Sequence, residues 1–486
     1  MTVIKKKNEV YLKITTEPHV HKELSEHFMF DVPGAKYMPA YQRFKWDGKI
    51  RLYSPGTGEI YAGLFDYVAD FLEKKGYEYN IEESDYGKPT DTESIVSPEA
   101  VTGYVRTLGL PFKPRDYQLR AIYQALRYNR KVLLSPTGSG KSLIIYAIVR
   151  WHLDGWYRNC LIIVPTVSLV EQMHKDFKTY GWDSADVHKI TAGSEKYVDH
   201  SVVISTWQSI YKEPRKFFKR FSVIIGDEAH LYKAKSLAGI LTKCHDAKYR
   251  IGLTGTLDGM ESHQLVLEGL FGRVNKVTKT VELMKKGHLT PLKVCVLLLK
   301  HGFVPFDDYQ QEMDYLVSHQ KRNNLIINLA SDLSGNTLIL FNYIEKHGDP
   351  LWDLLNSKVN DNRKIFYIHG GVDAMEREEA RLICEKEKDA IILASYGTFS
   401  TGINIKNLHN VIFASPSKSR VRNLQSIGRV LRKGDNKAQA VLYDIADHCA
   451  RGSKSNYTLR HLSARIKIYE EENFNYEIKE VKLKHD

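Results

Sequence analysis

The chain has 486 residues, of which 43% are hydrophobic and 26% charged, values ordinary for a globular protein with more than one core. Its five cysteines are scattered without a C-x-x-C pair, which argues against a disulfide framework or a cysteine zinc site and favours a reducing cytoplasm. The start lacks the apolar segment of a signal peptide, and no apolar run approaches the ~20 residues of a membrane span. The net charge of +12 fits either phosphate binding or a lysine-rich solvated surface.

The first 81 residues mix short strand-like runs with helical ones, such as the helix expected over residues 61–75. This mixture predicts a small α+β domain. The polar stretch 82–97 contains Gly and Pro without sustained periodicity, which is typical of a linker.

Within this domain, the dipeptide Asp47-Gly48 indicates a β-hairpin between two strand-like runs. A loop over residues 46–48 would place apolar residues on one face, against the domain core: Phe44, Ile50 and Leu52. The other face would carry opposed cations: Arg43, Lys45, Lys49 and Arg51. Like charges opposed across strands are destabilising, so this face predicts a bound polyanion; a solvated hairpin is the alternative.

From residue 131 onward, short apolar runs alternate with helical segments, a pattern typical of βαβ units around a parallel sheet. Strands are expected at 131–135, 160–165, 201–205, 222–226 and 250–254, with helices over 141–154 and 168–180.

The pattern then starts again. Strands are expected at 336–341, 364–369, 389–395, 410–414 and 438–443, with helices over 343–355, 375–387 and 420–431. The sequence therefore predicts an N-terminal domain with the start of the linker (1–90), two α/β blocks (91–280 and 281–455) and a helical or extended tail (456–486).

The clearest local signal is the string Ser135-Pro136-Thr137-Gly138-Ser139-Gly140-Lys141-Ser142, which follows an expected strand and opens an expected helix. This is the context of a phosphate-binding loop. The glycines let backbone N–H groups face an anion, and the helix N-terminus adds its positive end. Lys141 would neutralise the β- and γ-phosphates of ATP, and the Ser142 hydroxyl would bind Mg²⁺.

A second signal is Asp227-Glu228-Ala229-His230, at the end of the apolar strand 222–226. Carboxylates at the carboxyl end of a strand lie where ligands bind in open α/β sheets. Asp227 is expected to hold Mg²⁺, and Glu228 to orient and deprotonate the attacking water. The intact Lys141, Asp227 and Glu228 argue against a nucleic-acid-binding protein that has lost catalysis, and so does Arg432 through the family resemblance that follows.

Together these two strings resemble the superfamily 2 helicases and translocases. Arg115-Asp116-Tyr117-Gln118 resembles the adenine-recognising motif, with Gln118 on the base and Tyr117 or Arg115 stacking on it. Pro165-Thr166 resembles motif Ia, Thr206-Trp207-Gln208 resembles motif Ib, and Thr254-Gly255-Thr256 resembles the motif that couples hydrolysis to movement. The resemblance implies that motifs Ia and Ib contact the nucleic-acid backbone.

The second block continues the resemblance in family order. Residues 394–404 (ASYGTFSTGIN) resemble motif V, which implies strand contacts by Ser395 and Thr398 and a nucleotide contact by Gly402. Asn404 stands where this motif often has Asp. Residues 425–432 (QSIGRVLR) resemble motif VI, and the resemblance implies that Gln425, Arg429 and Arg432 reach across an interdomain cleft to the γ-phosphate.

Residues 38–53 and the particular residues in these motifs narrow the resemblance to the phage UvsW-type helicases. This resemblance spans nearly the whole chain. It implies two tandem RecA-like parallel-sheet motor domains behind a small α+β domain. It also implies ATP-dependent remodelling of forked or junction DNA in the cytoplasm of a host cell, by a monomer or weak oligomer. An RNA helicase and a double-strand translocase that does not unwind remain alternatives, since phosphate contacts dominate in all three.

Overall fold

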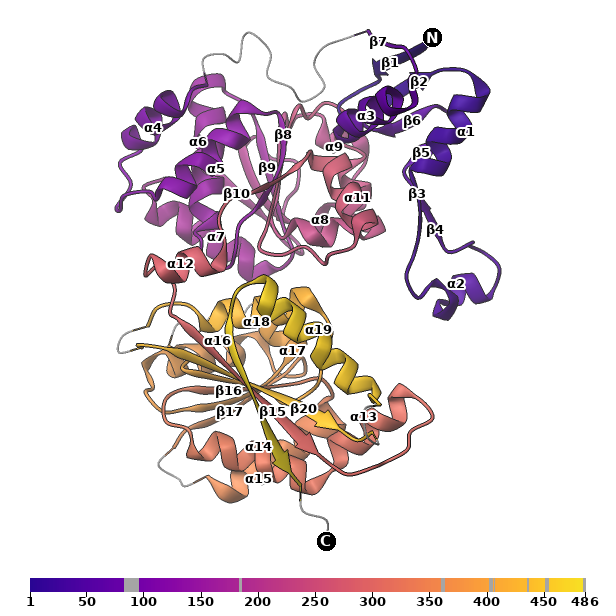
Figure 1. Ribbon diagram of the computed structural model, residues 1–486. Coiled ribbons are helices and arrows are strands. Elements are labelled where there is room, and N and C mark those ends of the chain that lie inside the picture. Colours follow the sequence, from indigo (N-terminus) through magenta and orange to yellow (C-terminus); the bar gives the residue numbers. More distant parts are fainter. Residues whose placement is uncertain are drawn as a thin grey trace. The chain divides into compact units, whose positions relative to one another are not determined.

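The computed structural model describes residues 1–82, 96–182, 186–359, 363–401, 405, 407–434, 437–450 and 454–483 (Figure 1). The chain divides into two compact units, one formed by Met1–Ser135 and Gly140–Val277, the other by Pro136–Ser139 and Thr278–Asp486. The division falls close to the boundary expected near residue 280. Most of the expected linker lies outside the described residues. Among the described helices, none is long and apolar enough to cross a membrane.

The N-terminal domain is built on a five-stranded sheet with the order β5-β6-β2-β1-β7. The strands are β1 (Thr2–Lys6), β2 (Tyr11–Thr15), β5 (Tyr53–Ser54), β6 (Glu59–Tyr61) and β7 (Tyr79–Ile81). Helices α1 (Pro18–His27) and α3 (Phe65–Lys75), the latter preceded by a 3₁₀ turn at Ala62–Leu64, bury their apolar faces against it. The predicted α+β domain is thus confirmed, with its expected helix.

The predicted hairpin over residues 42–52 is wrong. Strand β4 (Lys49–Arg51) pairs instead with β3 (Met29–Asp31), in the register Met29↔Arg51 and Asp31↔Lys49. The intervening residues 32–48, called here the lobe, form a 3₁₀ turn (Ala35–Tyr37) and a short helix, α2 (Pro39–Gln42). Pro39 suits the first turn of a helix and cannot donate to a strand ladder, which favours α2 over the expected strand.

The N-terminal domain is fixed to the first motor domain by buried and charged contacts. The Arg130 guanidinium pairs with the Glu9 carboxylate at 2.8 Å, and Arg273 pairs with Asp66 at 3.2 Å. A Cβ atom on Gly63 would lie 2.0 Å from the Glu268 carbonyl oxygen, so only glycine permits this close approach.

The first motor domain contains a seven-stranded, all-parallel sheet with the order β10-β11-β9-β12-β13-β8-β14. Its strands are β8 (Arg130–Leu134), β9 (Cys160–Val164), β10 (Val187–Ile190), β11 (Val202–Thr206), β12 (Val223–Gly226), β13 (Tyr249–Thr254) and β14 (Val274–Lys276). The helices are α4 (Pro98–Thr107), α5 (Asp116–Arg127), α6 (Lys141–Trp156), α7 (Val167–Thr179), α8 (Trp207–Ile210), α9 (Arg215–Phe218), α10 (Lys235–Leu241) and α11 (Glu261–Phe271). All five strands predicted in this block are present; β10 and β14, at the edges, were not predicted.

The second motor domain has another seven-stranded parallel sheet, with the order β17-β18-β16-β19-β20-β15-β21. Its strands are β15 (Leu292–Lys300), β16 (Thr337–Phe341), β17 (Ile365–Ile368), β18 (Ile391–Ser395), β19 (Asn410–Phe413), β20 (Ala440–His448) and β21 (Asn475–Lys482). The helices are α12 (Thr280–Lys285), α13 (Tyr309–Ser318), α14 (Gln320–Asp332), α15 (Asp349–Lys358), α16 (Ala374–Lys386), α17 (Tyr396–Thr401), α18 (Arg420–Val430) and α19 (Tyr457–Glu471). Two parallel sheets in tandem confirm the predicted fold class.

The C-terminal segment is part of the second sheet. Strand β21 pairs in parallel with β15 from Lys293↔Asn475 to Lys300↔Lys482, and α19 packs against β20 in the same sheet. The segment expected as a tail therefore supplies an edge strand and a covering helix.

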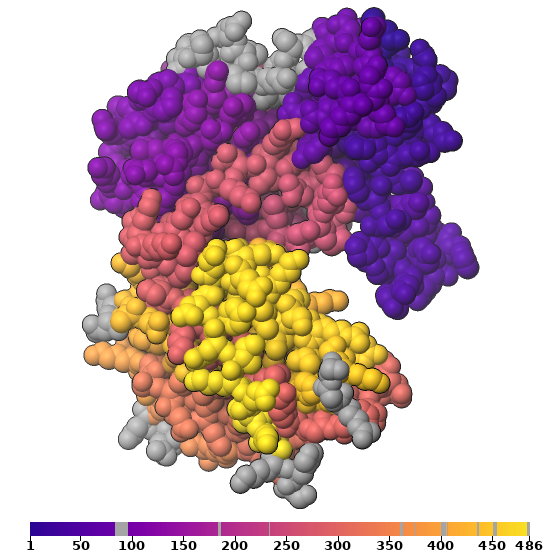
Figure 2. Space-filling view, in the orientation of Figure 1, coloured from indigo at the N-terminus to yellow at the C-terminus, as the bar shows by residue number. Residues whose placement is uncertain are grey.

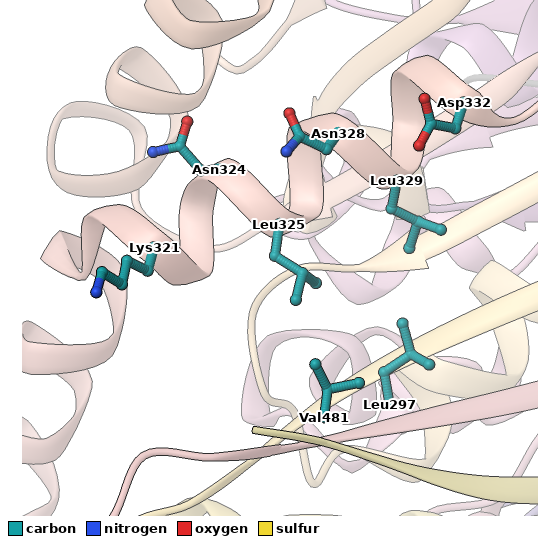
Figure 3. A pocket seen from close by; sticks show the side chains of 8 residues that line it. All are labelled: Leu297, Lys321, Asn324, Leu325, Asn328, Leu329, Asp332 and Val481. Atoms are coloured by element: carbon teal, nitrogen blue, oxygen red, sulfur yellow. The ribbon is translucent and has the colours of Figure 1, made fainter. Parts of the chain in front are cut away.

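A groove runs between α14 and the strands β15 and β21 (Figure 3). Leu297, Leu325, Leu329 and Val481 line its apolar side, while Lys321, Asn324, Asn328 and Asp332 stand along the helix. Leu297 lies in the middle of β15, so the groove lies on the face of the sheet. Ligands of parallel sheets bind instead beyond the carboxyl ends of the strands.

Candidate nucleotide site and nucleic-acid interface

The phosphate-binding loop joins β8 to α6 as predicted. Gly138 and Gly140 adopt the left-handed backbone conformation, with φ of +81° and +83°, which glycine reaches without steric cost. The Ser139 hydroxyl donates to the Pro136 carbonyl at 2.6 Å and closes the loop on itself. The N-terminus of α6, with Lys141 and Ser142 in its first turn, therefore follows directly on the loop.

Gln118 lies against this loop. A Cβ atom on Gly140 would come within 2.3 Å of the Gln118 side-chain nitrogen, so the two residues are in direct contact. The Gln118 side-chain oxygen accepts from the Arg115 backbone N–H at 2.8 Å, which fixes the amide at the start of α5. Tyr117 is buried and accepts from the Arg115 guanidinium at 2.7 Å. The buried Tyr117 ring is not available to stack on an adenine base. Of the two residues expected to stack there, only Arg115 is partly exposed.

Asp227 and Glu228 follow β12 at the carboxyl edge of the sheet of the first motor domain. Burial, together with the adjacent Glu228 charge, raises the pKa of Asp227 to about 6, although Lys141 opposes the shift. Glu228 has a left-handed backbone, with φ of 49°, and its N–H donates to the Asp227 carboxylate at 2.9 Å. The Lys141 ammonium lies 3.7 Å from the Glu228 carboxylate, so these charged groups face one small volume.

His230 links this acidic turn to the next strand. Its Nδ1 atom lies 2.9 Å from the Thr254 hydroxyl and 3.4 Å from the Glu228 carboxylate. The Thr254 hydroxyl donates in turn to the Thr256 carbonyl at 3.0 Å, and the Thr254 carbonyl accepts from the Ser135 N–H at 2.8 Å. A continuous path of polar contacts thus joins the acidic turn to the phosphate-binding loop.

The residues expected from motifs Ia and Ib lie together beyond β9 and β11, which are adjacent strands. Thr166 caps α7, its hydroxyl accepting from the Leu169 N–H at 3.4 Å. The Gln208 side chain donates to the Pro165 carbonyl at 3.3 Å and joins the two loops. Trp207 is partly exposed beside them, whereas the buried Thr206 hydroxyl lies 2.9 Å from the Ser209 hydroxyl. Of the residues expected to contact nucleic acid here, Pro165, Thr166, Trp207 and Gln208 are at least partly exposed.

In the second unit, Gln425 and Arg429 lie one turn apart on α18 and share a face. The Arg429 guanidinium lies 5.2 Å from the centre of the buried Phe399 ring. Arg432 follows the helix, and its carbonyl accepts from the Lys437 ammonium at 3.1 Å and the Thr290 hydroxyl at 3.4 Å. Burial lowers the pKa of Lys437 to about 8. These contacts hold the carboxyl end of α18, where Arg432 stands.

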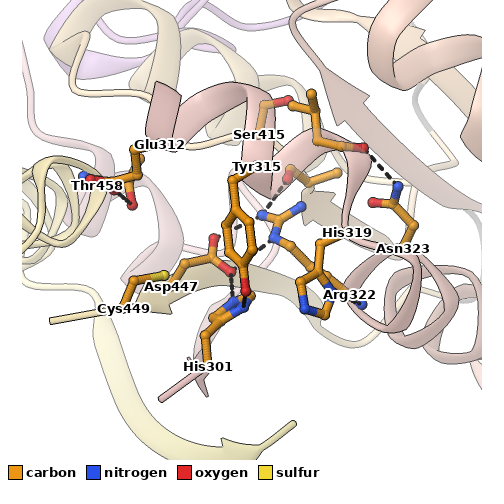
Figure 4. A network of polar contacts seen from close by, with 12 residues as sticks. His301, Glu312, Tyr315, His319, Arg322, Asn323, Ser415, Asp447, Cys449 and Thr458 are labelled. Atoms are coloured by element: carbon orange, nitrogen blue, oxygen red, sulfur yellow. Dashed lines mark hydrogen bonds and ion pairs between the residues drawn. The ribbon is translucent and has the colours of Figure 1, made fainter. Parts of the chain in front are cut away.

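A buried polar network, which the sequence analysis did not identify, holds the segment before α18 (Figure 4). Arg322 forms an ion pair with Asp447 at 2.8 Å and donates to the Ala414 carbonyl at 2.8 Å. Burial alone would raise the pKa of Asp447, but Arg322 and a hydrogen bond with His301 hold it well below its usual range. The side chain of Ser415 contacts the Nδ1 atom of His347 at 3.0 Å.

The network occupies the carboxyl ends of β15, β19 and β20. Its members are far apart in the sequence, and none belongs to a short motif. Two of its members could be noticed from the sequence: His301 directly follows the apolar strand β15, and Asp447 lies near the carboxyl end of β20.

Two residues expected to contact a strand in the second unit are not presented for it. The side chains of Ser395 and Thr398 are buried, and their hydroxyls are hydrogen-bonded to each other at 2.9 Å. This bond closes the turn after β18, so contact by these side chains is not supported. Gly402 and Asn404, of the same motif, lie outside the described residues.

The cations of the N-terminal domain are exposed or partly exposed, but they do not form the expected opposed face. Arg43 and Lys45 lie in the lobe, whereas Lys49 and Arg51 lie in β4. Arg51 is paired with Asp47 at 2.5 Å. Phe44, expected in the domain core, is almost fully exposed, whereas Leu52 is buried and Ile50 packs on the core as predicted.

Three family models match the chain in order. They are the N-terminal domain of the DNA helicase UvsW at residues 3–82, the res subunit of type III restriction enzymes at residues 111–259, and the conserved C-terminal helicase domain at residues 320–434. One match falls within each of the three domains described above.

Individual proteins match over longer stretches. The ATP-dependent DNA helicase uvsW of Enterobacteria phage T4 is 33% identical, over 97% of this chain and 98% of its own length. The crystal structure of T4 UvsW aligns with 99% of both chains at 30% identity, with a TM-score of 0.53. The DNA 3'-5' translocase XPB2 of Sulfurisphaera tokodaii is 25% identical, over 67% of this chain and 80% of its own length. On this similarity, the chain belongs to the family of the ATP-dependent DNA helicase UvsW.

Proposed function

We propose that this chain is an ATP-dependent DNA helicase that acts on forked or branched DNA. The observation that carries the proposal is the arrangement at the carboxyl edge of the seven-stranded sheet of the first motor domain. The phosphate-binding loop follows β8, Asp227 follows β12 and Thr254 is the last residue of β13, and these three strands are adjacent in the order β12-β13-β8. This edge is where open α/β sheets bind ligands, and the related T4 protein is an ATP-dependent DNA helicase.

The nucleotide would be held by the loop and by α5. We infer that the backbone of the loop surrounds the phosphates, with Lys141 neutralising their charge, and that Arg115 and Gln118 hold the adenine. The loop residues are Pro136, Thr137, Gly138, Ser139 and Gly140. Their support is the left-handed glycines and the contact between Gln118 and Gly140.

The Ser142 hydroxyl and the Asp227 carboxylate suit Mg²⁺, which proteins usually hold through one or two carboxylates together with substrate phosphates. Within the described residues, no cluster of three or more His, Cys, Asp or Glu side chains could hold a metal ion. An ion at Ser142 and Asp227 would be shared with the nucleotide, and it would supply positive charge to the phosphoryl group during transfer.

For hydrolysis, we assign Glu228 to the attacking water, because its carboxylate shares a small volume with Lys141. Gln425, Arg429 and Arg432 would stabilise charge on the γ-phosphate in the transition state, a contribution on the order of 10³–10⁵ in rate for arginines of this kind. The polar path through His230 and Thr254 would couple the acidic turn to the phosphate-binding loop.

The DNA strand would lie along the loops after β9 and β11, with Pro165, Thr166, Trp207 and Gln208 as its contacts. The cations Arg43, Lys45, Lys49 and Arg51 would hold phosphates of a second arm of the branch. Phosphate contacts fix position without reading sequence, so this arrangement suits a substrate defined by its shape.

The test is ATP hydrolysis by the full chain with a matched set of nucleic acids: single-stranded DNA, duplex DNA, a fork, a four-way junction and single-stranded RNA. We expect slow hydrolysis without nucleic acid and the highest rate with the fork or junction. Equal stimulation by plain duplex would favour a double-strand translocase. Stimulation by RNA but not by DNA would favour an RNA helicase with the same motor.

A further inference from the structure

The lobe, residues 32–48 of the N-terminal domain, stands out from its sheet on the two short strands β3 and β4 (Figure 1). Figure 2 shows the same region as a projection at the edge of the N-terminal domain. The lobe has a fixed shape of its own. The Val32 N–H donates to the Gly48 carbonyl at 2.8 Å where the chain enters and leaves, and the Lys45 N–H donates to the Ala40 carbonyl at 2.9 Å.

The interior of the lobe is filled by its own residues. A Cβ atom on Gly48, whose φ is +79°, would lie 2.9 Å from the Ala35 Cβ atom and 3.1 Å from the Tyr41 ring. The Trp46 indole N–H donates to the Lys49 carbonyl at 2.9 Å. Ala35 and Gly48 are buried, so the lobe holds its shape without a partner.

Three of the side chains that the lobe exposes to solvent are aromatic. Phe44 is 97% exposed and Tyr37 is 73% exposed, and Tyr41 remains 40% exposed between them in the sequence. Phe44 also has a left-handed backbone, with φ of 54°, a conformation that is uncommon for a bulky residue. Exposed apolar rings and backbone strain are both unfavourable in the isolated protein, and such features gather at binding sites.

The lobe also carries exposed cations. Lys36, Arg43 and Lys45 are exposed within the lobe, and the Lys36 ammonium lies 5.1 Å from the centre of the Tyr37 ring. The one carboxylate in residues 32–48, that of Asp47, is paired with Arg51. Aromatic rings interleaved with cations match the bases and phosphates of an unpaired nucleic-acid strand.

We propose that the lobe binds unpaired bases at the branch point of the DNA, with Phe44 and Tyr37 stacking on base faces while Lys36, Arg43 and Lys45 hold the flanking phosphates. Inside a duplex each base face is covered by its neighbours, so rings reach a base only where the stack ends. This inference rests on the proposed branched substrate and gives the lobe a role beyond holding phosphates: it recognises the opened end of the duplex.

The test is binding of the full-length protein to a fork that carries 2-aminopurine at the first unpaired position, and to a fully paired duplex of equal length. Phe44→Ala is expected to weaken fork binding at least about fivefold, the lower range for one base–aromatic stack, and to leave duplex binding unchanged. Stacking would also alter the 2-aminopurine fluorescence in the wild-type complex, and Phe44→Ala would remove that change. Because Phe44 is almost fully exposed, the variant keeps the folded structure.

Two further variants separate stacking from simple apolar contact. Phe44→Trp keeps a π face and is expected to bind the fork like the wild type, whereas Phe44→Leu keeps an apolar side chain and is expected to bind like Phe44→Ala. Tyr157→Ala is the matched control, because Tyr157 is 86% exposed with φ of 53° but lies at the end of α6, away from the lobe in the sequence. It should leave fork binding unchanged.

Wild-type fork affinity in Phe44→Ala would overturn the proposal, and wild-type affinity in Phe44→Leu would overturn stacking as its basis. Binding of the wild-type protein to the fork and to the duplex shows whether the proposed function itself has failed. If it binds the fork no better than the duplex, the branched substrate itself is wrong, and the lobe proposal falls with it.

Discussion

At the scale of single residues, the nucleotide site shows which parts of the chemistry short motifs can predict. Lys141, Asp227 and Glu228 lie together because the loops that carry them follow buried parallel strands, and the carboxyl ends of such strands share one edge. The burial of Tyr117, Ser395 and Thr398 could not be predicted in this way. Their burial depends on how α5 and the turn after β18 pack, which residue type and spacing do not determine.

Lys141→Ala is expected to abolish ATP hydrolysis while leaving the fold intact, because the side chain contributes charge to a loop whose shape comes from its glycines. ATPase assays with saturating fork DNA, together with circular dichroism, measure both effects. Lys189→Ala is the matched control, since it removes a lysine–glutamate ion pair on the same motor domain. It should hydrolyse ATP at the wild-type rate, and near-wild-type hydrolysis by Lys141→Ala would show that the phosphate site is misassigned.

The buried ion pair between Arg322 and Asp447 is expected to stabilise the second motor domain. Arg322→Met leaves a fully buried carboxylate without its main partner, a change that costs about 3–5 kcal/mol in other proteins. Hydrogen exchange of the β15 and β20 backbone amides in the full chain measures this local stability. Lys346→Met, which removes the exposed pair with Asp314, should have little effect on this protection, because water screens an exposed ion pair. Equal protection in the two variants would contradict the account of the network.

At the scale of elements, most internal strands of the two motor sheets were predicted, whereas the edge strands β10, β14 and β21 and the internal strand β15 were not. Central parallel strands are buried on both faces and therefore are continuous apolar runs, as in Cys160–Val164 and Ile391–Ser395. Edge strand β21 alternates charged with apolar residues, and much of its length is exposed, so it was expected only as a tail. The lobe was expected as a hairpin because the dipeptide Asp47-Gly48 is a strong turn signal. The true partner of β4 is β3, a longer-range pairing that no local signal reveals.

The lobe as a whole can be removed. Asp31 and Lys49 are the last paired residues of β3 and β4, so replacing residues 32–48 with Asn-Gly would close an ordinary two-residue hairpin. We expect this variant to fold and to keep ATP hydrolysis stimulated by saturating single-stranded DNA, because the loops after β9 and β11 belong to the motor domain and are unchanged.

Fork affinity of the same variant should fall because the lobe cations are removed. The log–log slope of affinity against salt concentration should become shallower by about 0.7 for each phosphate of an unpaired strand, or about 0.9 for each duplex phosphate, that the protein no longer neutralises. Fork binding at several salt concentrations, for the variant and the wild type, measures both quantities. An unchanged slope would mean that the lobe cations are only solvated.

At the scale of the whole molecule, the order of domains was predictable because two blocks repeat the same alternation of apolar strands and helices. The contacts that fix the N-terminal domain to the first motor domain were not. They join residues as distant in sequence as Glu9 and Arg130, or Gly63 and Glu268. These contacts fix the lobe to the motor domain that contains α6 and the acidic turn, so a nucleotide-driven movement of that domain would also move the lobe.

The second motor domain is expected to contribute directly to hydrolysis. Arg432→Ala should lower kcat by roughly 10³-fold or more with little change in KM for ATP, because its contact would form only in the transition state. Steady-state ATPase kinetics with fork DNA measure the two constants. Arg460→Ala, which removes an exposed arginine of α19 in the same domain, should change neither. A rise in KM with kcat unchanged would assign Arg432 to nucleotide binding alone.

The measurement that tests the central claim most directly is strand separation of a forked DNA by the full-length protein, with and without ATP, compared with Glu228→Gln. The wild-type protein is expected to separate the strands only when ATP is hydrolysed. Glu228→Gln should bind the same fork and ATP yet separate nothing, because the carboxylate that we assign to the attacking water would be absent. Strand separation by Glu228→Gln at the wild-type rate, or separation by the wild type without ATP, would contradict the account.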